Sequence, residues 1–231
     1  MRRFMAGLLA IALLTGCAST YRARKATPSG FLGDYSQLKK GDKDQELLIY
    51  VSPRAGTNKY EKIMMDPVRI YVSETNSRLS KIPKEDLQRM VNYLDSTVRA
   101  LLKESFTMVD QPGPGVMQLR IALTDAQTAN RALDTVSTLL PIGLAVSELR
   151  NLATGSHTAV GSAGIEYEGL DSLTHKRLFA AVDRRVGRKV TGKLDKFDKW
   201  HTANDAIDYW ASKIHQRLLE QALEGNLKLE N

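Results

Sequence analysis

Hydrophobic residues at helical spacing predict two amphipathic helices. The first covers residues 83–102, with Pro83 at its start and acidic residues in its first turn. The second starts at Thr202, which forms a capping-box pattern with Asp205, and runs to about residue 222. Residues 133–152 also look helical, but Pro141 and Gly143 interrupt them.

Strands are predicted where apolar and polar residues alternate or where β-branched residues gather. They cover residues 46–51, 59–72 and 116–125, and residues 159–167 and 176–185 form a hairpin. Pro67 is compatible only with a sheet edge or a bulge. The order of elements predicts an α/β (α+β) fold: a single domain with a mixed, largely antiparallel sheet and packed amphipathic helices.

The start of the chain has the layout of a signal peptide. Arg2 and Arg3 precede an apolar stretch of about ten residues, and Gly16 stands before Cys17, which is the only cysteine. This stretch is too short to cross a bilayer, which requires roughly 20 apolar residues. Residues 1–16 are therefore predicted to be removed.

Leu14-Thr15-Gly16-Cys17 resembles the lipobox of bacterial lipoproteins. The resemblance implies that the Cys17 sulfur receives a diacylglycerol, that cleavage precedes Cys17 and that the new amino terminus is acylated. Several acyl chains anchor a protein stably. Ala18, where Asp commonly signals retention at the inner membrane, implies the periplasmic face of the outer membrane. The alternative is an incidental thiol beside an ordinary signal peptide.

The predicted organisation has four parts. Residues 1–16 are the signal peptide, 17–45 the lipidated cysteine and a flexible tether, 46–225 the domain, and 226–231 a C-terminal tail. The stretch SGFLGDYSQLKKG within the tether is more apolar than a linker requires, so it is expected to lie against the domain. Residues 135–147 carry no charge, and the sequence leaves open whether they are core or an exposed partner or membrane site.

Charge points to an anionic partner. The chain has a net charge of +7, and without Arg2 and Arg3 it keeps 31 basic and 26 acidic residues. Such a surface suits anionic lipid, an acidic envelope protein or an anionic envelope polymer. The candidate contact is a basic cluster in residues 183–193, and the alternative is a basic loop that closes the hairpin. Aromatic residues for base stacking are missing there, so nucleic-acid binding is not expected. The cluster consists of Arg184, Arg185, Arg188 and Lys189.

Two carboxylates are the best candidates for catalysis. Glu166 and Glu168 lie two residues apart on a predicted strand, so they share a face at roughly 6.6–7 Å, a spacing compatible with an inverting glycosidase. The alternative is a solvated strand face on which Arg177 and Arg184 are cross-strand partners. The four histidines lack metal-binding spacing and no phosphate-binding loop is present, so neither a metal nor a cofactor is expected.

Four segments resemble an uncharacterised family of Gram-negative lipoproteins, defined by a domain of unknown function. They are SGFLGDYSQL, KYEKIMMDPVRIY, IEYEGLDSLT and LFAAVDRR, and the likeness runs from about Ser29 to Leu223. His175-Lys176 replaces the Gly-Glu pair that is common in the family. The resemblance implies location and fold but no activity. We therefore expect a binding, scaffolding or accessory lipoprotein of the envelope without catalysis; the alternative is a peptidoglycan hydrolase that uses Glu166 and Glu168.

Overall fold

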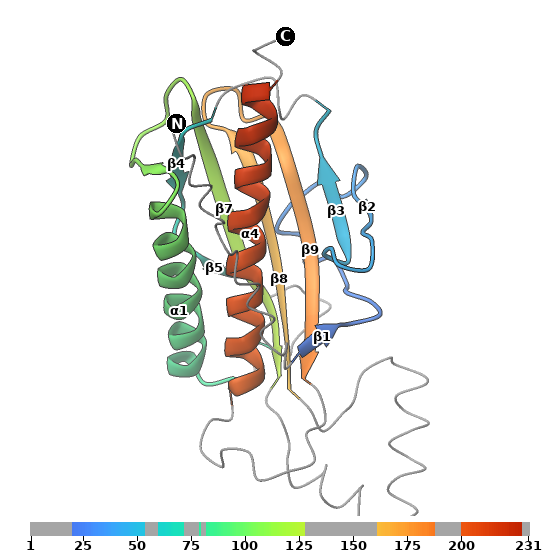
Figure 1. Ribbon diagram of the computed structural model, residues 1–231. Helices are drawn as coiled ribbons and strands as arrows, with labels where there is room; N and C mark the ends of the chain where they lie inside the picture. Colours follow the sequence, from blue (N-terminus) through green and yellow to red (C-terminus); the bar gives the residue numbers. More distant parts are fainter. Residues whose placement is uncertain are drawn as a thin grey trace, which may run out of the picture.

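A mixed sheet with two helices on one face forms the body of the molecule (Figure 1). The computed structural model describes residues 20–53, 60–71, 79, 82–127, 161–187 and 200–227, with side chains in the last helix to Glu220. The signal peptide, Cys17 and residues 135–147 lie outside these residues. Helices α1 (Lys84–Lys103) and α4 (His201–Leu227) confirm the two predicted helices. Helix α4 begins at His201, one residue before the predicted cap Thr202, and continues past the predicted end of the domain at residue 225.

Within the described residues the sheet has nine strands in the order β2-β3-β9-β8-β7-β4-β6, with β1 paired to β9 and β5 to β7. The single domain and the predicted α/β class with a mixed sheet are confirmed. The strands are β1 (Thr20–Arg22), β2 (Lys39–Lys40), β3 (Leu48–Val51), β4 (Lys62–Met65), β5 (Arg69–Ile70), β6 (Thr107–Met108), β7 (Val116–Gln127), β8 (Ser162–Asp171) and β9 (Arg177–Gly187).

The three long strands β7, β8 and β9 are antiparallel and form the centre of the sheet. Two short strands in succession border each outer side of this centre. Strands β4 and β5 run parallel to β7, whereas β3 and β1 run antiparallel to β9. Between Met65 and Arg69 the β4–β5 segment contains one more residue than β7 opposite, and Pro67 lies in this bulge, as predicted.

The main hydrophobic core lies between the helices and the sheet. The apolar stripe of α1 and the stripe of α4 pack on alternate residues of β7, β8 and β9. Leu94 and Trp210 are fully buried there, and so are Leu119 and Tyr167 of the sheet. Full burial of a large apolar side chain contributes roughly 1.5–3 kcal/mol, so this layer supplies most of the driving force for folding.

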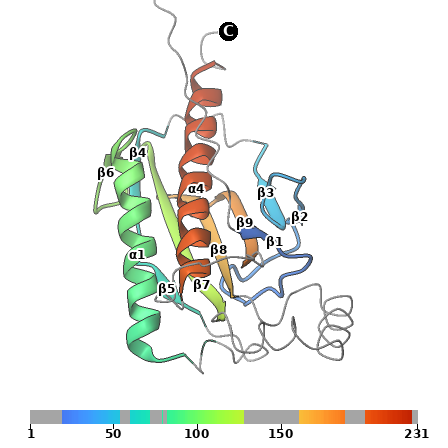
Figure 2. The same ribbon diagram turned by 60° about the horizontal axis from the view of Figure 1, so that its bottom comes forward.

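The opposite face of the sheet is covered by residues 26–38, which we call the covering segment. Phe31 and Leu32 pack there on Ala122, Ala180 and Val182. The apolar part of the predicted tether thus lies against the domain, as expected. Figure 2 shows β1, β2 and β3 gathered along β9, beyond α4.

The prediction of a flexible tether up to residue 45 is wrong from Thr20 onward. Thr20 already pairs with Gly187, and β2 pairs with β3. The Arg22 guanidinium donates to several backbone carbonyls of residues 41–46, including those of Gly41 at 3.2 Å and Gln45 at 3.0 Å. The segment is ordered because β9 offers it an unpaired edge and the sheet offers it an apolar face.

Candidate binding site on the covered face of the sheet

Glu166 and Glu168 are buried beneath the covering segment. Their relative exposures are 0% and 2%. Both side chains project from β8 toward the covering segment, so the prediction that they share a strand face is confirmed. The alternative of a solvated strand face is wrong, because the covering segment excludes water from these carboxylates.

Glu166 holds the covering segment in place. The backbone N–H of Ser29 donates to Oε1 at 2.6 Å, and the Tyr35 hydroxyl donates to Oε2 at 2.6 Å. Burial and the hydrogen bond to Glu166 raise the pKa of Tyr35 to about 12. The tyrosine therefore stays a neutral donor at any physiological pH, and both oxygens of Glu166 have a partner.

Glu168 lies between two arginines. Nη1 of Arg120 lies 2.5 Å from Oε1, and Nε of Arg177 lies 2.9 Å from Oε2. Arg177, the predicted cross-strand partner, also donates to the backbone carbonyls of Leu32 at 2.7 Å and Asp34 at 2.6 Å. The ion pair with Arg177 therefore fixes the covering segment, and Glu168 has no carboxylate oxygen left without a partner.

Arg120 contacts the covering segment and also keeps an accessible part. Its guanidinium lies 5.0 Å from the centre of the Phe31 ring, a cation–π contact. Its side chain keeps 29% exposure, compared with 15% for that of Arg177. A fixed, partly accessible guanidinium is suited to bind a carboxylate or phosphate.

An open depression with a volume of about 590 Å³ lies beside this ion-pair cluster. It is bounded by the covering segment, by β7 and β8, and by the turn between β8 and β9. Most of its lining residues are polar. They include two carboxylates, the buried Glu168 and the exposed Asp34. The lining residues are Leu32, Asp34, Gln37, Gln118, Arg120, Glu168, Leu170, His175 and Arg177.

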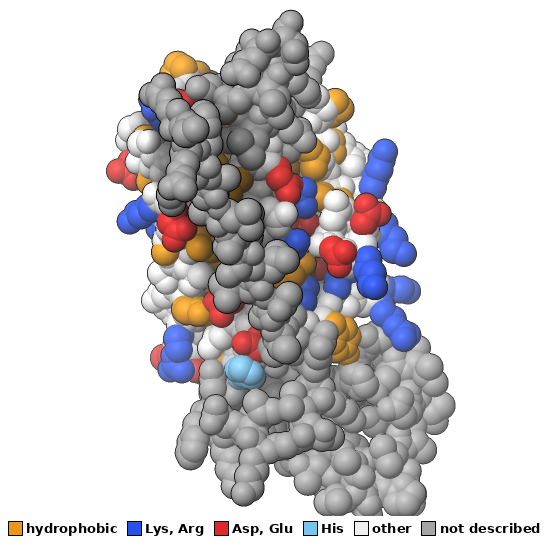
Figure 3. Space-filling model, viewed as in Figure 1, with side chains coloured by type: hydrophobic (Ala, Val, Ile, Leu, Met, Phe, Trp, Pro, Cys, Tyr) orange, Lys and Arg blue, Asp and Glu red, His pale blue; other side chains and the backbone are white. Residues whose placement is uncertain are grey.

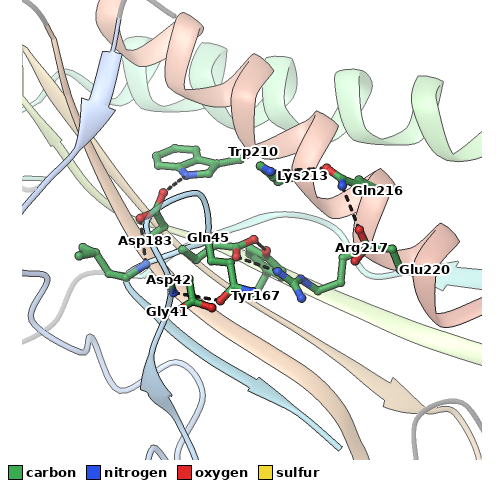
Figure 4. A network of polar contacts seen from close by, with 12 residues as sticks. Gly41, Asp42, Gln45, Tyr167, Asp183, Trp210, Lys213, Gln216, Arg217 and Glu220 are labelled. Carbon is green, nitrogen blue, oxygen red and sulfur yellow. Dashed lines mark hydrogen bonds and ion pairs between the residues drawn. The ribbon is translucent and has the colours of Figure 1, made fainter. Parts of the chain in front are cut away.

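A second polar network lies on the helical face of the sheet (Figure 4). Buried Asp183 accepts hydrogen bonds from the Trp210 indole at 2.8 Å and from the backbone N–H of Leu47 at 3.2 Å. Buried Glu46 accepts from the Tyr167 hydroxyl and pairs with Arg217 at 3.0 Å. Burial raises the pKa of Asp183 and of Tyr167. These contacts join residues 46–47 to the sheet and to α4.

The structure separates the two described residues of the predicted basic cluster, Arg184 and Arg185. Arg184 pairs with Asp125 at 2.8 Å on the covered face. Arg185 is buried on the helical face, 3.6 Å from the centre of the Tyr209 ring. Neighbouring residues of a strand point to opposite faces, which separates the two arginines. Arg188 and Lys189 lie outside the described residues, so the proposed joint contact is corrected for Arg184 and Arg185.

The described histidines occupy separate places. His175 ends the turn after β8, His201 lies 3.2 Å from Asp205, and His215 lies 2.9 Å from the Ser105 hydroxyl. In the part of the chain that the structure describes, no group of three or more His, Cys, Asp or Glu side chains is arranged to hold a metal ion. Among the helices of that part, none is long and apolar enough to span a membrane.

The sequence does not identify Arg120 as a site residue. Arg120 alternates with apolar residues on β7, which predicts an outward-facing position but not the covering segment above it. One signal was available: GFLGDYSQL is apolar enough to cover a strand face that bears charged residues. Tyr35 and Glu166, which meet through a hydrogen bond, both lie in segments that carry the family resemblance.

Comparison with known proteins decides the family. Residues 27–214 match the model of a family described as "Protein of unknown function (DUF3313)". The chain belongs to the DUF3313 family. The match includes the covering segment, so the covered face of the sheet falls within the family region.

Relatives of this DUF3313 protein include a lipoprotein. The chain is 26% identical over 191 residues to the uncharacterized lipoprotein YdcL of Escherichia coli (strain K12). The aligned region covers 82% of this chain and 84% of YdcL. YdcL of Escherichia coli O157:H7 gives the same values. The predicted resemblance to an uncharacterised lipoprotein family of Gram-negative bacteria is confirmed.

Two solved structures share a weaker likeness. A PelC dodecamer from Paraburkholderia phytofirmans is 12% identical, with 72% of this chain and 94% of that chain covered and a TM-score of 0.40. Lipoprotein GNA1162 from Neisseria meningitidis is 11% identical, with 69% and 98% covered and a TM-score of 0.31.

Proposed function

We propose that this protein is a lipid-anchored binding component of the cell envelope, held through Cys17 at the periplasmic face of the outer membrane. The order of charged, apolar and small residues before Cys17 supports the anchor, and similarity to a lipoprotein supports it independently. Ala18 supports the outer membrane as the location.

The observation that carries the binding role is the accessible part of Arg120 at the edge of the depression. The guanidinium is fixed by Glu168 on one side and by Phe31 on another, so little side-chain entropy is lost when a ligand binds. The ligand class that this chemistry selects is an anionic envelope polymer, bound through a carboxylate or phosphate group. The Asp34 carboxylate also lines the depression and repels a ligand with a high density of negative charge. A polymer whose anionic groups are well separated therefore fits this site best.

We further propose that the protein does not catalyse hydrolysis. An inverting glycosidase needs one protonated carboxylic acid and one carboxylate that activates a water molecule. The oxygens of Glu166 are bonded to Ser29 and Tyr35, and those of Glu168 to two arginines. Activating water at either carboxylate requires breaking the contacts that hold the covering segment.

Co-sedimentation with purified peptidoglycan sacculi tests binding and hydrolysis together, and lipopolysaccharide is the second probe. We expect binding to one of these polymers, weakened about tenfold or more in Arg120→Gln, because a charged hydrogen bond contributes roughly 1.5–3 kcal/mol. Arg89→Gln is the matched control, since Arg89 is an exposed arginine of α1. Binding unaffected by Arg120→Gln contradicts the site. Released muropeptides that disappear in Glu166→Gln establish the hydrolase instead.

A further inference from the structure

A basic edge surrounds the point where the chain enters the domain. We define the basic edge as the exposed basic residues of the segment between β1 and β3. The turn at residues 41–46 follows β2 directly and lies beside β1, because its backbone carbonyls accept hydrogen bonds from the Arg22 side chain. Figure 3 shows basic side chains along this margin of the molecule, beside β2 and β3. The members of the basic edge are Arg24, Lys25, Lys39, Lys40 and Lys43.

The basic edge lies close to the lipidation site along the chain. Only Ala18 and Ser19 separate Cys17 from Thr20, the first residue of β1. Three residue steps span at most about 11 Å when fully extended. A lipid on Cys17 therefore holds β1 within that distance of the bilayer surface, whereas a flexible tether of 28 residues would have let the domain move away.

Charge complementarity between basic side chains and anionic headgroups determines which part of the domain faces the membrane. The basic edge has five positive side chains, and the same segment between β1 and β3 has three exposed acids, Asp34, Asp42 and Asp44. Asp34 lines the depression on the covered face, so only Asp42 and Asp44 belong to the turn beside β2. Electrostatic attraction to anionic headgroups acts over roughly 8–10 Å at physiological ionic strength, comparable to the length of the link. Strand β2 is the first in the order of the sheet, so no further described strand covers the basic edge.

We infer that the basic edge rests on the anionic headgroups of the membrane that holds the lipid anchor. The inference rests on the proposed lipidation of Cys17 and goes beyond it by giving the domain an orientation. The β2 edge of the sheet lies at the bilayer, and the β6 edge points away from it. The chemistry recognised is a surface of anionic phospholipid headgroups.

Site-specific quenching on the lipidated full-length protein tests this orientation. Cys17 is the only natural cysteine and its sulfur is blocked by lipid, so Asp44→Cys and Asp110→Cys each introduce one reactive thiol. Asp44 belongs to the turn beside β2, and Asp110 follows β6 at the other end of the sheet order. A fluorophore at each position is compared in vesicles of equal parts phosphatidylglycerol and phosphatidylcholine that contain a headgroup-labelled quencher lipid.

We expect severalfold stronger quenching at residue 44 than at residue 110. Lys39→Gln with Lys40→Gln should reduce the difference, because each basic residue near an anionic surface changes the contact equilibrium about fivefold. Lys84→Gln with Lys103→Gln, two exposed lysines of α1, is the charge-matched control and should change nothing. Vesicles of pure phosphatidylcholine, or high salt, should likewise reduce the difference in quenching between residues 44 and 110.

The orientation is overturned if quenching is equal at the two positions. It is also overturned if the Lys39 and Lys40 substitutions leave the quenching difference unchanged. Mass spectrometry of the peptide that contains Cys17 separates this outcome from failure of the anchor. A lipidated cysteine with equal quenching refutes the orientation alone. An unmodified cysteine refutes the anchor, and the orientation with it.

Discussion

Asp171 organises the turn between β8 and β9. Its Oδ1 accepts from the Thr174 N–H and hydroxyl, both at 2.8 Å, and its Oδ2 accepts from the Tyr60 hydroxyl at 2.9 Å. Partial burial raises the pKa of Asp171, but these hydrogen bonds outweigh burial and lower it from the ordinary value. Folding therefore favours the ionised form of this carboxyl.

Asp171→Asn should lower the free energy of unfolding at pH 7 by about 1–2 kcal/mol, because the amide replaces one acceptor oxygen by a donor. A lowered folded-state pKa gives stability that is present above the unfolded pKa and is lost as pH falls through the folded pKa. The difference between variant and wild type should therefore shrink below roughly pH 4. Urea unfolding across this pH range measures it, with Asp110→Asn as the exposed control. A difference that persists unchanged at low pH argues against a charge effect.

At the scale of elements, the covering segment depends on buried carboxylates more than on its own structure. Phe31 and Leu32 supply apolar contacts, while Glu166 and Arg177 bind its backbone and Tyr35. Removing one of these polar contacts should release the segment locally, because its attachment involves few groups compared with the helical core.

Glu166→Gln should increase hydrogen exchange in residues 29–38 while the core strands stay protected. The glutamine side chain has one acceptor oxygen for two donors, so one of the two bonds to Ser29 and Tyr35 is lost at a cost of about 1–3 kcal/mol. Glu104→Gln, at the exposed end of α1, is the matched control. Unchanged exchange in residues 29–38 contradicts the anchoring role of Glu166.

The long elements were predictable from sequence because each carries several periods of its pattern. Helices α1 and α4 and strands β7, β8 and β9 each have enough residues for periodicity to be visible. Strands β1 and β2 have three and two residues, so no pattern exists to detect, and their pairing depends on the edges of β9 and β3. The sequence identifies Glu166 and Glu168 as a pair on one strand face but does not predict their burial, because burial by a distant segment is a tertiary property.

At the scale of the whole molecule, the N-terminal region is part of the fold from Thr20 onward. The sheet carries the helical core on one face and the covering segment on the other, and β1 completes the β9 edge. A lipid on Cys17 would therefore attach the membrane to a folded domain by a link of two residues. The proposed anchor, the proposed orientation and the polar depression all fit a domain that is held at a membrane surface.

Replacing Cys17 by Ser in the full chain tests this account most directly, because the anchor depends on that one sulfur. We predict that the wild-type protein is found in the outer-membrane fraction, with a mature chain that starts at lipidated Cys17 by mass spectrometry. Cys17→Ser should accumulate as precursor that retains residues 1–16 or appear as a soluble periplasmic form. A Cys17→Ser protein that fractionates with the outer membrane like the wild type would contradict the account.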